Sequence, residues 1–479
     1  MHDLIKRDAT DQLAALAARR VSAAELLKAE LARHEETHGT LNAVVAVDLE
    51  RAMSHARAID DLRGRGEALG VLAGLPMTVK DTFDVAGMPA TSGVEALRKR
   101  MVRDASAVRR AREAGAVIWG KTNTPVMAGD WQTYNPLYGT TNNPWDPART
   151  PGGSSGGAAA ALAAGVTALE IGSDIGGSLR VPAGFCGVFS HKPTWGLISQ
   201  HGHVPPSPGS WSERDLNVVG PMARSARDLR LLLSVLEHGT MAARAAPAEL
   251  AGLRIGLWLD EPSFPLDPQV RAVIEAFAAE LAAAGAEVIP VGSPVHMPNL
   301  MAAYQTLLGA VLGEDLPPAM IRRLELLRGW AKWAMARGAD LQSRAALTLA
   351  YTATHREWMA ADAVRNRLRR EAGAVLDGFD AILAPTAPVA AFSHNHRDFA
   401  GRKLTDSAGR VFTYNAMLNW IGLATALHFP ATTIPAGLTP AGLPVGAQLI
   451  GPFGADSRLL AIAQAIDENV RGFVAPPAP

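Results

Sequence analysis

The sequence predicts an α/β fold: one large domain with a mixed central β-sheet covered by helices on both faces. Short apolar runs alternate with helical patterns along most of the 479 residues, as in layered α/β proteins with a mainly parallel sheet. Apolar residues make up 48% of the chain and charged residues 19%, which supplies enough material for a core. No Gly- or Pro-rich linker long enough to separate two independent domains interrupts this pattern.

Residues 1–60 are predicted to form a helical lead-in that packs on the main domain. Apolar residues recur at helical spacing between Thr10 and Glu36. Within this range Ser22 and Glu25 form the Ser-x-x-Glu pattern of a capping box. This pattern predicts the start of a second helix directly after Ser22.

The main domain is expected to span residues 61–470, after a first strand within the lead-in. Between residues 300 and 375 the strand signal disappears and a long helical pattern replaces it, so we expect a helical insertion there. The Pro-rich segment 471–479 is predicted to be a loose tail. The apolar runs expected to form strands are 44–47, 77–79, 116–119, 168–172, 254–259, 287–291 and 381–384.

The charge balance argues against two classes of partner. The 46 basic and 46 acidic side chains give a formal net charge of zero, with no long basic run. This balance attracts neither nucleic acid nor an anionic membrane, so we expect neither as a partner. The charged first residues lack the apolar stretch of a signal peptide, and the single cysteine, Cys186, suits a reducing compartment. We therefore expect a cytoplasmic protein.

Two short patterns suggest nucleotide or hydrolase chemistry but stand in the wrong context. Residues 115–122 match the P-loop pattern, yet residues 116–119 are strand-like where a P-loop needs a loop of free N–H groups. Ser155 sits in a Gly-x-Ser-x-Gly pattern, but no apolar strand precedes it as a nucleophile elbow requires. We expect neither phosphate binding nor an α/β-hydrolase elbow.

The histidines and the cysteine do not indicate a metal centre or a thiol nucleophile. His201 and His203, like His394 and His396, lie two positions apart in polar segments, without a Cys or acidic cluster at ligand spacing. We interpret them as surface histidines and expect no metal site. Cys186 has no base beside it in the sequence and is interpreted as a small packed residue.

Two Gly/Ser clusters, residues 151–157 and 172–180, carry the strongest indication of chemistry. A run of alanines separates them and an apolar segment follows the second, so they do not read as a flexible linker. Glycines let the backbone approach a substrate closely, and successive N–H groups at a helix start can bind negative charge. Such clusters are typical of an oxyanion hole beside a serine nucleophile. Lys80, at the end of an apolar run, is the candidate base if burial lowers its pKa.

These segments resemble the amidase signature family of serine hydrolases, in outline from about residue 10 to 470. The motifs follow one another in the family's order. They are Gly-Leu-Pro-Met-Thr-Val-Lys-Asp at 74–81, Gly-Lys-Thr-Asn-Thr-Pro at 120–125, Thr-Asn-Asn-Pro-Trp-Asp at 141–146, Pro-Gly-Gly-Ser-Ser-Gly-Gly at 151–157 and Gly-Ser-Asp-Ile-Gly-Gly-Ser-Leu-Arg-Val-Pro-Ala-Gly-Phe-Cys-Gly at 172–187.

The resemblance implies a Ser-cisSer-Lys triad. Ser178 would be the nucleophile, Ser154 the bridging serine held by a cis peptide bond, and Lys80 the base that takes the nucleophile's proton through Ser154. Water would then hydrolyse the acyl-enzyme, with no metal or organic cofactor. The N–H groups implied for the oxyanion hole are those of Ile175, Gly176, Gly177 and Ser178. The side chains implied as support are Ser155, Asp174 and Arg180.

The family leaves the substrate open, and we expect a neutral aryl or alkyl amide. Carbamates, including urethanes, and activated esters extend this class because attack on them gives the same kind of oxyanion. The expected pocket residues are Ala128 and Gly129, which leave room for an acyl group, and Trp131. Trp131, Trp195 and Trp211 either offer flat apolar faces to the substrate or pack in the core or at its rim, and the sequence leaves both positions open. The oligomeric state, monomer or homodimer, stays open.

The alternative from the same family is the glutaminase (A) subunit of a tRNA-dependent amidotransferase. In that subunit the segment after the nucleophile helix resembles Tyr-Gly-Leu followed by Asp-Gln-Ile-Gly-Pro. This chain instead reads His-Gly-His-Val-Pro-Pro-Ser-Pro-Gly at 201–209 and Leu-Asn-Val-Val-Gly-Pro at 216–221. The difference favours an amidase that acts alone.

Overall fold

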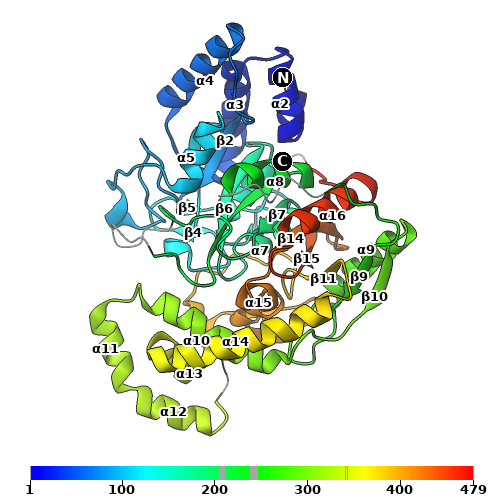
Figure 1. Ribbon diagram of the computed structural model, residues 1–479. Coiled ribbons are helices and arrows are strands. Elements are labelled where there is room, and N and C mark those ends of the chain that lie inside the picture. Colours follow the sequence, from blue (N-terminus) through cyan, green and yellow to red (C-terminus); the bar gives the residue numbers. More distant parts are fainter. Residues whose placement is uncertain (1, 204–211, 238–245, 340, 342, 478–479) are drawn as a thin grey trace.

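An 11-stranded mixed β-sheet forms the centre of the computed structural model, which describes residues 2–203, 212–237, 246–339, 341 and 343–477 (Figure 1). The mixed sheet and its helical cover confirm the predicted fold class. In sheet order the strands are β1 (Val44–Val47), β3 (Val117–Thr122), β2 (Pro76–Lys80), β6 (Leu169–Asp174), β8 (Val218–Ala223), β7 (Phe189–Lys192), β14 (Ala431–Leu438), β15 (Pro444–Ile450), β11 (Ala381–Pro385), β9 (Arg254–Leu257) and β10 (Glu287–Pro290).

The expectation of a mainly parallel sheet is wrong. Strands β3, β2 and β6 form one parallel group and β11, β9 and β10 another, but the pairs between and beside these groups are antiparallel. The apolar runs predicted the parallel groups, whereas β7, β8, β14 and β15 were missed. Their sequences contain Gly, Pro and polar residues, yet tertiary packing buries most of them completely.

Helices cover both faces of the sheet. The helices other than the group that follows β10 are α1 (His2–Ile5), α2 (Ala9–Ala17), α3 (Ala23–Leu41), α4 (Leu49–Gly64), α5 (Ser106–Glu113), α6 (Gly156–Ala163), α7 (Arg180–Cys186), α8 (Ala226–Leu236), α9 (Pro268–Ala283), α15 (Asn419–Ala426) and α16 (Asp456–Asn469). Two small ladders join β4 (Tyr134–Asn135) to β5 (Gly139–Thr140) and β12 (Lys403–Thr405) to β13 (Val411–Thr413).

The predicted capping box opens α3. The Glu25 amide donates to the Ser22 hydroxyl at 3.1 Å, and the Ser22 amide donates to the Glu25 carboxylate at 2.9 Å. These two bonds satisfy N–H groups that have no partner inside the helix. None of the helices in the described ranges is long and apolar enough to span a bilayer.

Five helices follow β10 and gather at the end of the molecule opposite α2, α3 and α4 (Figure 1). They are α10 (Met297–Gly313), α11 (Pro318–Leu326), α12 (Arg328–Ala336), α13 (Arg344–Tyr351) and α14 (His355–Leu376). Helix α10 packs against α13, α14 and α15. Tyr304 of α10 also donates to the carbonyl of Ile175, the residue that follows β6, so this helix lies beside the end of that strand. The division into lead-in, main domain and tail stays a prediction.

Candidate active site

Two neighbouring parallel strands place Lys80 and the second Gly/Ser cluster at one edge of the sheet. Strand β2 ends at Lys80, and strand β6 ends at Asp174. The two strands pair in parallel, with Val79 opposite Ile171. Because parallel strands run in the same direction, their carboxyl ends meet at the same edge. The loop that leaves β6 there, residues 175–179, leads directly into α7.

Lys80 is fully buried and makes two hydrogen bonds through its amine. Nζ lies 2.7 Å from the hydroxyl oxygen of Ser154 and 3.0 Å from that of Ser173. Burial lowers the pKa of Lys80 to about 7, although nearby Asp174 and Glu170 act to raise it. At neutral pH a large share of the molecules therefore has an amine that can accept a proton. Sequence reasoning missed the second contact, to Ser173.

The first Gly/Ser cluster forms the turn before α6. The peptide bond between Gly153 and Ser154 is cis, as the family resemblance implies. A Cβ added at Gly153 would lie 2.5 Å from the carbonyl oxygen of Asp130, so glycine is the residue that fits there. The Ser155 amide donates to the Ser178 carbonyl at 3.2 Å. This bond ties the first cluster to the residue predicted as the nucleophile.

The N–H groups predicted for the oxyanion hole fall into two kinds. Within the described part of the chain, those of Ile175, Gly176 and Ser178 have no protein acceptor. The Gly177 amide instead donates to the Asp174 carboxylate at 2.9 Å, so it is already engaged. Three unengaged N–H groups beside a serine can stabilise an oxyanion.

Asp174 and Arg180 form a buried ion pair that holds this loop. Two guanidinium nitrogens of Arg180 lie 3.0 and 3.1 Å from the Asp174 carboxylate oxygens. Burial alone would raise the pKa of Asp174, but the charge and hydrogen bonds of Arg180, the Lys192 charge and the Leu179 amide together outweigh burial and hold this pKa below its ordinary value. The same carboxylate accepts the Leu179 amide at 3.1 Å. Asp174 therefore stays ionised and fixes the turn between β6 and α7.

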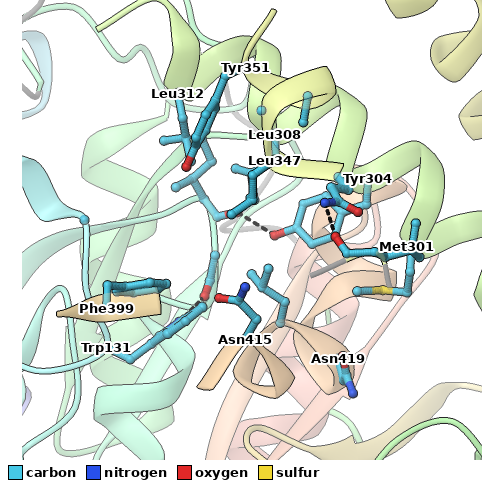
Figure 2. A pocket seen from close by; sticks show the side chains of 18 of the residues that line it. Trp131, Met301, Tyr304, Leu308, Leu312, Leu347, Tyr351, Phe399, Asn415 and Asn419 are labelled. Carbon is cyan, nitrogen blue, oxygen red and sulfur yellow. Dashed lines mark hydrogen bonds between the residues drawn. The ribbon is translucent and has the colours of Figure 1, made fainter. Parts of the chain in front are cut away.

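Ser178 lines a cavity of about 600 Å³, and apolar side chains form most of the cavity wall (Figure 2). The predicted pocket residues Ala128, Gly129 and Trp131 all line it. The ring centroids of Trp131 and Phe399 lie 5.7 Å apart. The residues that sequence reasoning missed come from distant segments: Phe264, Met301, Tyr304, Gln305, Leu308, Leu312, Leu347, Tyr351, Phe399, Asn415 and Asn419.

Of the two positions left open for Trp195, the structure shows packing within the fold. Its ring stacks on His428, with centroids 4.9 Å apart, and its indole N–H donates to the Arg214 carbonyl at 3.1 Å. These contacts hold it in the packing of the fold and away from the cavity wall. Trp211 lies outside the described residues.

One charged side chain, Asp130, lines the cavity among the residues that the structure describes. Its carboxylate forms an ion pair with Arg402 and accepts a hydrogen bond from the Tyr414 hydroxyl at 2.7 Å. The Arg402 guanidinium also lies over the Tyr414 ring, 5.2 Å from its centroid. The described residues of the cavity wall thus present no unpaired charge to a bound molecule.

The P-loop-like segment is a buried strand, as its apolar residues predicted. Residues Val117–Thr122 form β3, and all six are buried. Lys121 forms an ion pair with Asp81, with 2.6 Å between Nζ and the carboxylate oxygen, and donates to the Pro89 carbonyl at 2.8 Å. Its amine is therefore committed to the protein and not directed at a phosphate.

The histidine and cysteine interpretations have different outcomes. His203 is buried, against the expectation of a surface position: its backbone forms a β-bridge with Phe83, and the two rings lie 4.6 Å apart. Burial lowers the pKa of His203 well below its ordinary value. Cys186 is buried and unpaired, as expected of a packed residue, and burial raises the pKa of its thiol. No three His, Cys, Asp or Glu side chains of the described ranges gather as a metal site.

Comparison with known proteins places the chain among amide-cleaving enzymes. The sequence model of the Amidase family matches residues 25–460. The (A) subunit of glutamyl-tRNA(Gln) amidotransferase from Synechococcus sp. (strain CC9605) is 35% identical over 95% of this chain and 95% of its own length. A solved structure described as an amidase is 30% identical, with a TM-score of 0.79, covering 97% of this chain and all of that one. A protein from a study of the origins of an s-triazine catabolic enzyme is 28% identical, also with a TM-score of 0.79, covering 98% and 100%.

Proposed function

Because the chain belongs to the amidase signature family of enzymes, which act on amide C–N bonds, we propose that it hydrolyses neutral aryl or alkyl amides. Carbamates, including urethanes, and activated esters belong to the same proposal. The reaction passes through an acyl-enzyme on Ser178. The observation that carries the proposal is the apolar cavity lined by Ser178, whose described residues present no unpaired charge.

In the proposed mechanism Lys80 acts as the base in its neutral form. Ser178 gives its proton to Ser154 while Ser154 gives its own to the Lys80 amine, and the Ser178 oxygen attacks the substrate carbonyl carbon. The unengaged N–H groups of Ile175, Gly176 and Ser178 bind the resulting oxyanion. Lys80 then returns the proton through Ser154 to the leaving nitrogen as the C–N bond breaks. Water releases the acyl group by the same route.

The cavity supports a neutral substrate of moderate size. A volume of about 600 Å³ falls within the range of pockets that enclose small organic ligands. Trp131 and Phe399 offer aromatic faces to an aryl or alkyl group. Asn415 and Gln305 add uncharged polar groups at the wall, which can orient an amide without requiring a charge.

The glutaminase alternative is favoured by the identity of 35% to the (A) subunit of an amidotransferase. The cavity chemistry disfavours it. Free glutamine carries a carboxylate and an ammonium group, and each must find a partner when it leaves water. Among the described residues the cavity wall holds no cation, and its one carboxylate, Asp130, is already paired with Arg402.

A hydrolysis screen with the purified protein tests the proposal. The substrates are para-nitroanilides of aryl and alkyl acids, an aryl carbamate, a primary amide and glutamine, with Ser178→Ala as the control. We expect release of nitroaniline from the neutral anilides and little ammonia from glutamine. Preferential hydrolysis of glutamine would replace this proposal with the alternative.

A further inference from the structure

Two aromatic side chains hold consecutive carbonyl groups of the loop that carries the oxyanion N–H groups. The Tyr304 hydroxyl donates to the Ile175 carbonyl at 2.9 Å, which a dashed line marks in Figure 2. The Trp131 indole N–H donates to the Gly176 carbonyl at 2.7 Å. Neither donor belongs to the loop: Tyr304 lies on α10, and Trp131 follows the short turn at 126–128.

The bond from Tyr304 fixes the direction of a particular N–H group. The Ile175 carbonyl and the Gly176 N–H belong to one trans peptide unit, so they point in opposite directions. Holding the carbonyl therefore aims the N–H. The Gly176 N–H is one of the three without a protein acceptor in the described ranges, whereas the next one, of Gly177, is held by Asp174.

The Tyr304 hydroxyl is not needed to fix α10 in place. Leu300 and Leu307 of the same helix are fully buried, and Ala303 is almost so. These apolar contacts supply the packing energy that orders a helix. Tyr304 itself is 1% exposed, and burial raises the pKa of its hydroxyl, so the group remains a protonated donor. The buried Tyr304 hydroxyl therefore donates to the Ile175 carbonyl, which satisfies its need for a hydrogen-bond acceptor.

We propose that Tyr304 is a positioning residue that aligns the Gly176 N–H with the oxyanion of the tetrahedral intermediate. This inference rests on the proposed function, because it assumes acyl transfer at Ser178. Tyr304 acts through the Ile175 carbonyl and does not contact the reacting atoms. Its contribution grows as negative charge develops on the substrate oxygen, so it stabilises the transition state more than the bound substrate.

Tyr304→Phe, which removes one hydroxyl and keeps the ring, tests the proposal. Loss of a direct oxyanion donor lowers kcat by about 100- to 1000-fold, and loss of its alignment should cost about 10- to 100-fold. We expect KM for a neutral anilide to stay within about twofold, since ground-state binding is retained. The affinity for a trifluoromethyl ketone, which forms a tetrahedral adduct with the serine, should fall by the same factor as kcat. The affinity for a neutral amide that is not cleaved should not change.

Tyr138→Phe is the matched control, because it removes a tyrosine hydroxyl outside the cavity wall. It should leave kcat, KM and ketone affinity unchanged. An unchanged kcat in Tyr304→Phe, or a change in KM alone, would overturn the inference. Failure of Tyr304→Phe to fold would also contradict it, because the hydroxyl would then be holding α10. If Ser178→Ala keeps the wild-type rate, the proposed function fails instead, so the two failures are distinguishable.

Discussion

The amine nitrogen of Lys80 lies 2.7 Å from the hydroxyl oxygen of Ser154, although 74 positions separate the two residues in the chain. Strand β2 delivers the lysine, and the turn before α6 delivers the serine. Both side chains are almost entirely shielded from water. A buried amine that contacts a hydroxyl can exchange a proton with it directly, without a competing water molecule.

Replacement of Ser178 by alanine should remove nearly all amide hydrolysis and leave the fold intact. Residues of one catalytic unit are non-additive, so Lys80→Ala combined with Ser178→Ala should be little worse than Ser178→Ala alone. Steady-state rates on a para-nitroanilide measure both effects, and circular dichroism reports the fold. Retention of more than about a tenth of the wild-type rate by folded Ser178→Ala would exclude it as the nucleophile.

The rate should rise with pH through the pKa of Lys80. The base works only when neutral, and burial lowers this pKa to about 7. We therefore expect kcat/KM for a neutral amide to climb from about pH 6 and level off on the alkaline side, about one to two units above that pKa. A substrate without a titratable group ensures that the profile reports the free enzyme.

Two variants identify the group behind that profile. Lys80→Arg keeps the positive charge but cannot lose its proton, so it should be nearly inactive at every pH. Lys192 is the control, because burial lowers its pKa to about 7 as well while its amine donates to the Pro193 carbonyl. Lys192→Met should leave the midpoint of the profile unchanged. If the midpoint of the pH profile shifts in Lys192→Met, the titration belongs to Lys192 and not to Lys80.

The buried charge of Lys80 should also lower the free energy of unfolding of the protein at low pH. In the unfolded chain its pKa is near 10.5, and in the folded chain about 7. Below pH 7 the lysine is charged in both states, so the folded state bears the full cost of burial, on the order of 5 kcal/mol. Between pH 7 and 10.5 the folded state holds fewer protons, so wild-type stability rises with pH.

Lys80→Met removes this cost and should melt at a higher temperature than wild type at pH 6. The difference should narrow as the pH rises from 7 toward 10, where the wild-type lysine is neutral when folded. Thermal melting of both proteins between pH 6 and 10 measures this difference in melting temperature. A variant that is less stable than wild type at pH 6 would show that the contacts to Ser154 and Ser173 outweigh the burial cost.

The sequence predicted most fully what lies in contiguous motifs at strand ends. Lys80 closes an apolar run, and residues 172–180 follow another, so the meeting of their carboxyl ends could be expected from a parallel pair. Ser173 lies inside a motif too, but the pattern does not say which serine faces the lysine. That depends on the register of β6 against β2 and on which side chains of β6 point to the same face of the sheet as Lys80.

The wall of the cavity could not be predicted in the same way. Tyr304 contacts a loop carbonyl 129 positions away, and Phe399 meets Trp131 through a segment that carries no motif. Helical periodicity indicates which residues of α10 are apolar, but not what they pack against. His203 shows the converse error: a polar segment suggested the surface, and a β-bridge to Phe83 buries it.

The ion pair between Asp130 and Arg402 should set the preference for neutral substrates. Arg402→Met keeps an apolar side chain beside the Tyr414 ring but leaves the Asp130 carboxylate without its cation at the cavity wall. An unpaired carboxylate disfavours an apolar ligand, so KM for a neutral anilide should rise. An anilide that carries an ammonium group should bind better than it does to wild type, because the ammonium can pair with the Asp130 carboxylate.

Two further variants isolate the charge. Arg410→Met breaks the neighbouring ion pair with Asp406, outside the cavity wall, and should leave both KM values unchanged. Asp130→Asn combined with Arg402→Met removes both charges, and should restore the preference for the neutral anilide because no unpaired carboxylate remains. The test is to measure KM for the neutral and the ammonium-bearing anilide in wild type, in the two single variants and in the double variant. If Arg402→Met keeps the wild-type ratio of these values, the pair serves packing alone, and the preference for neutral substrates comes from the apolar wall.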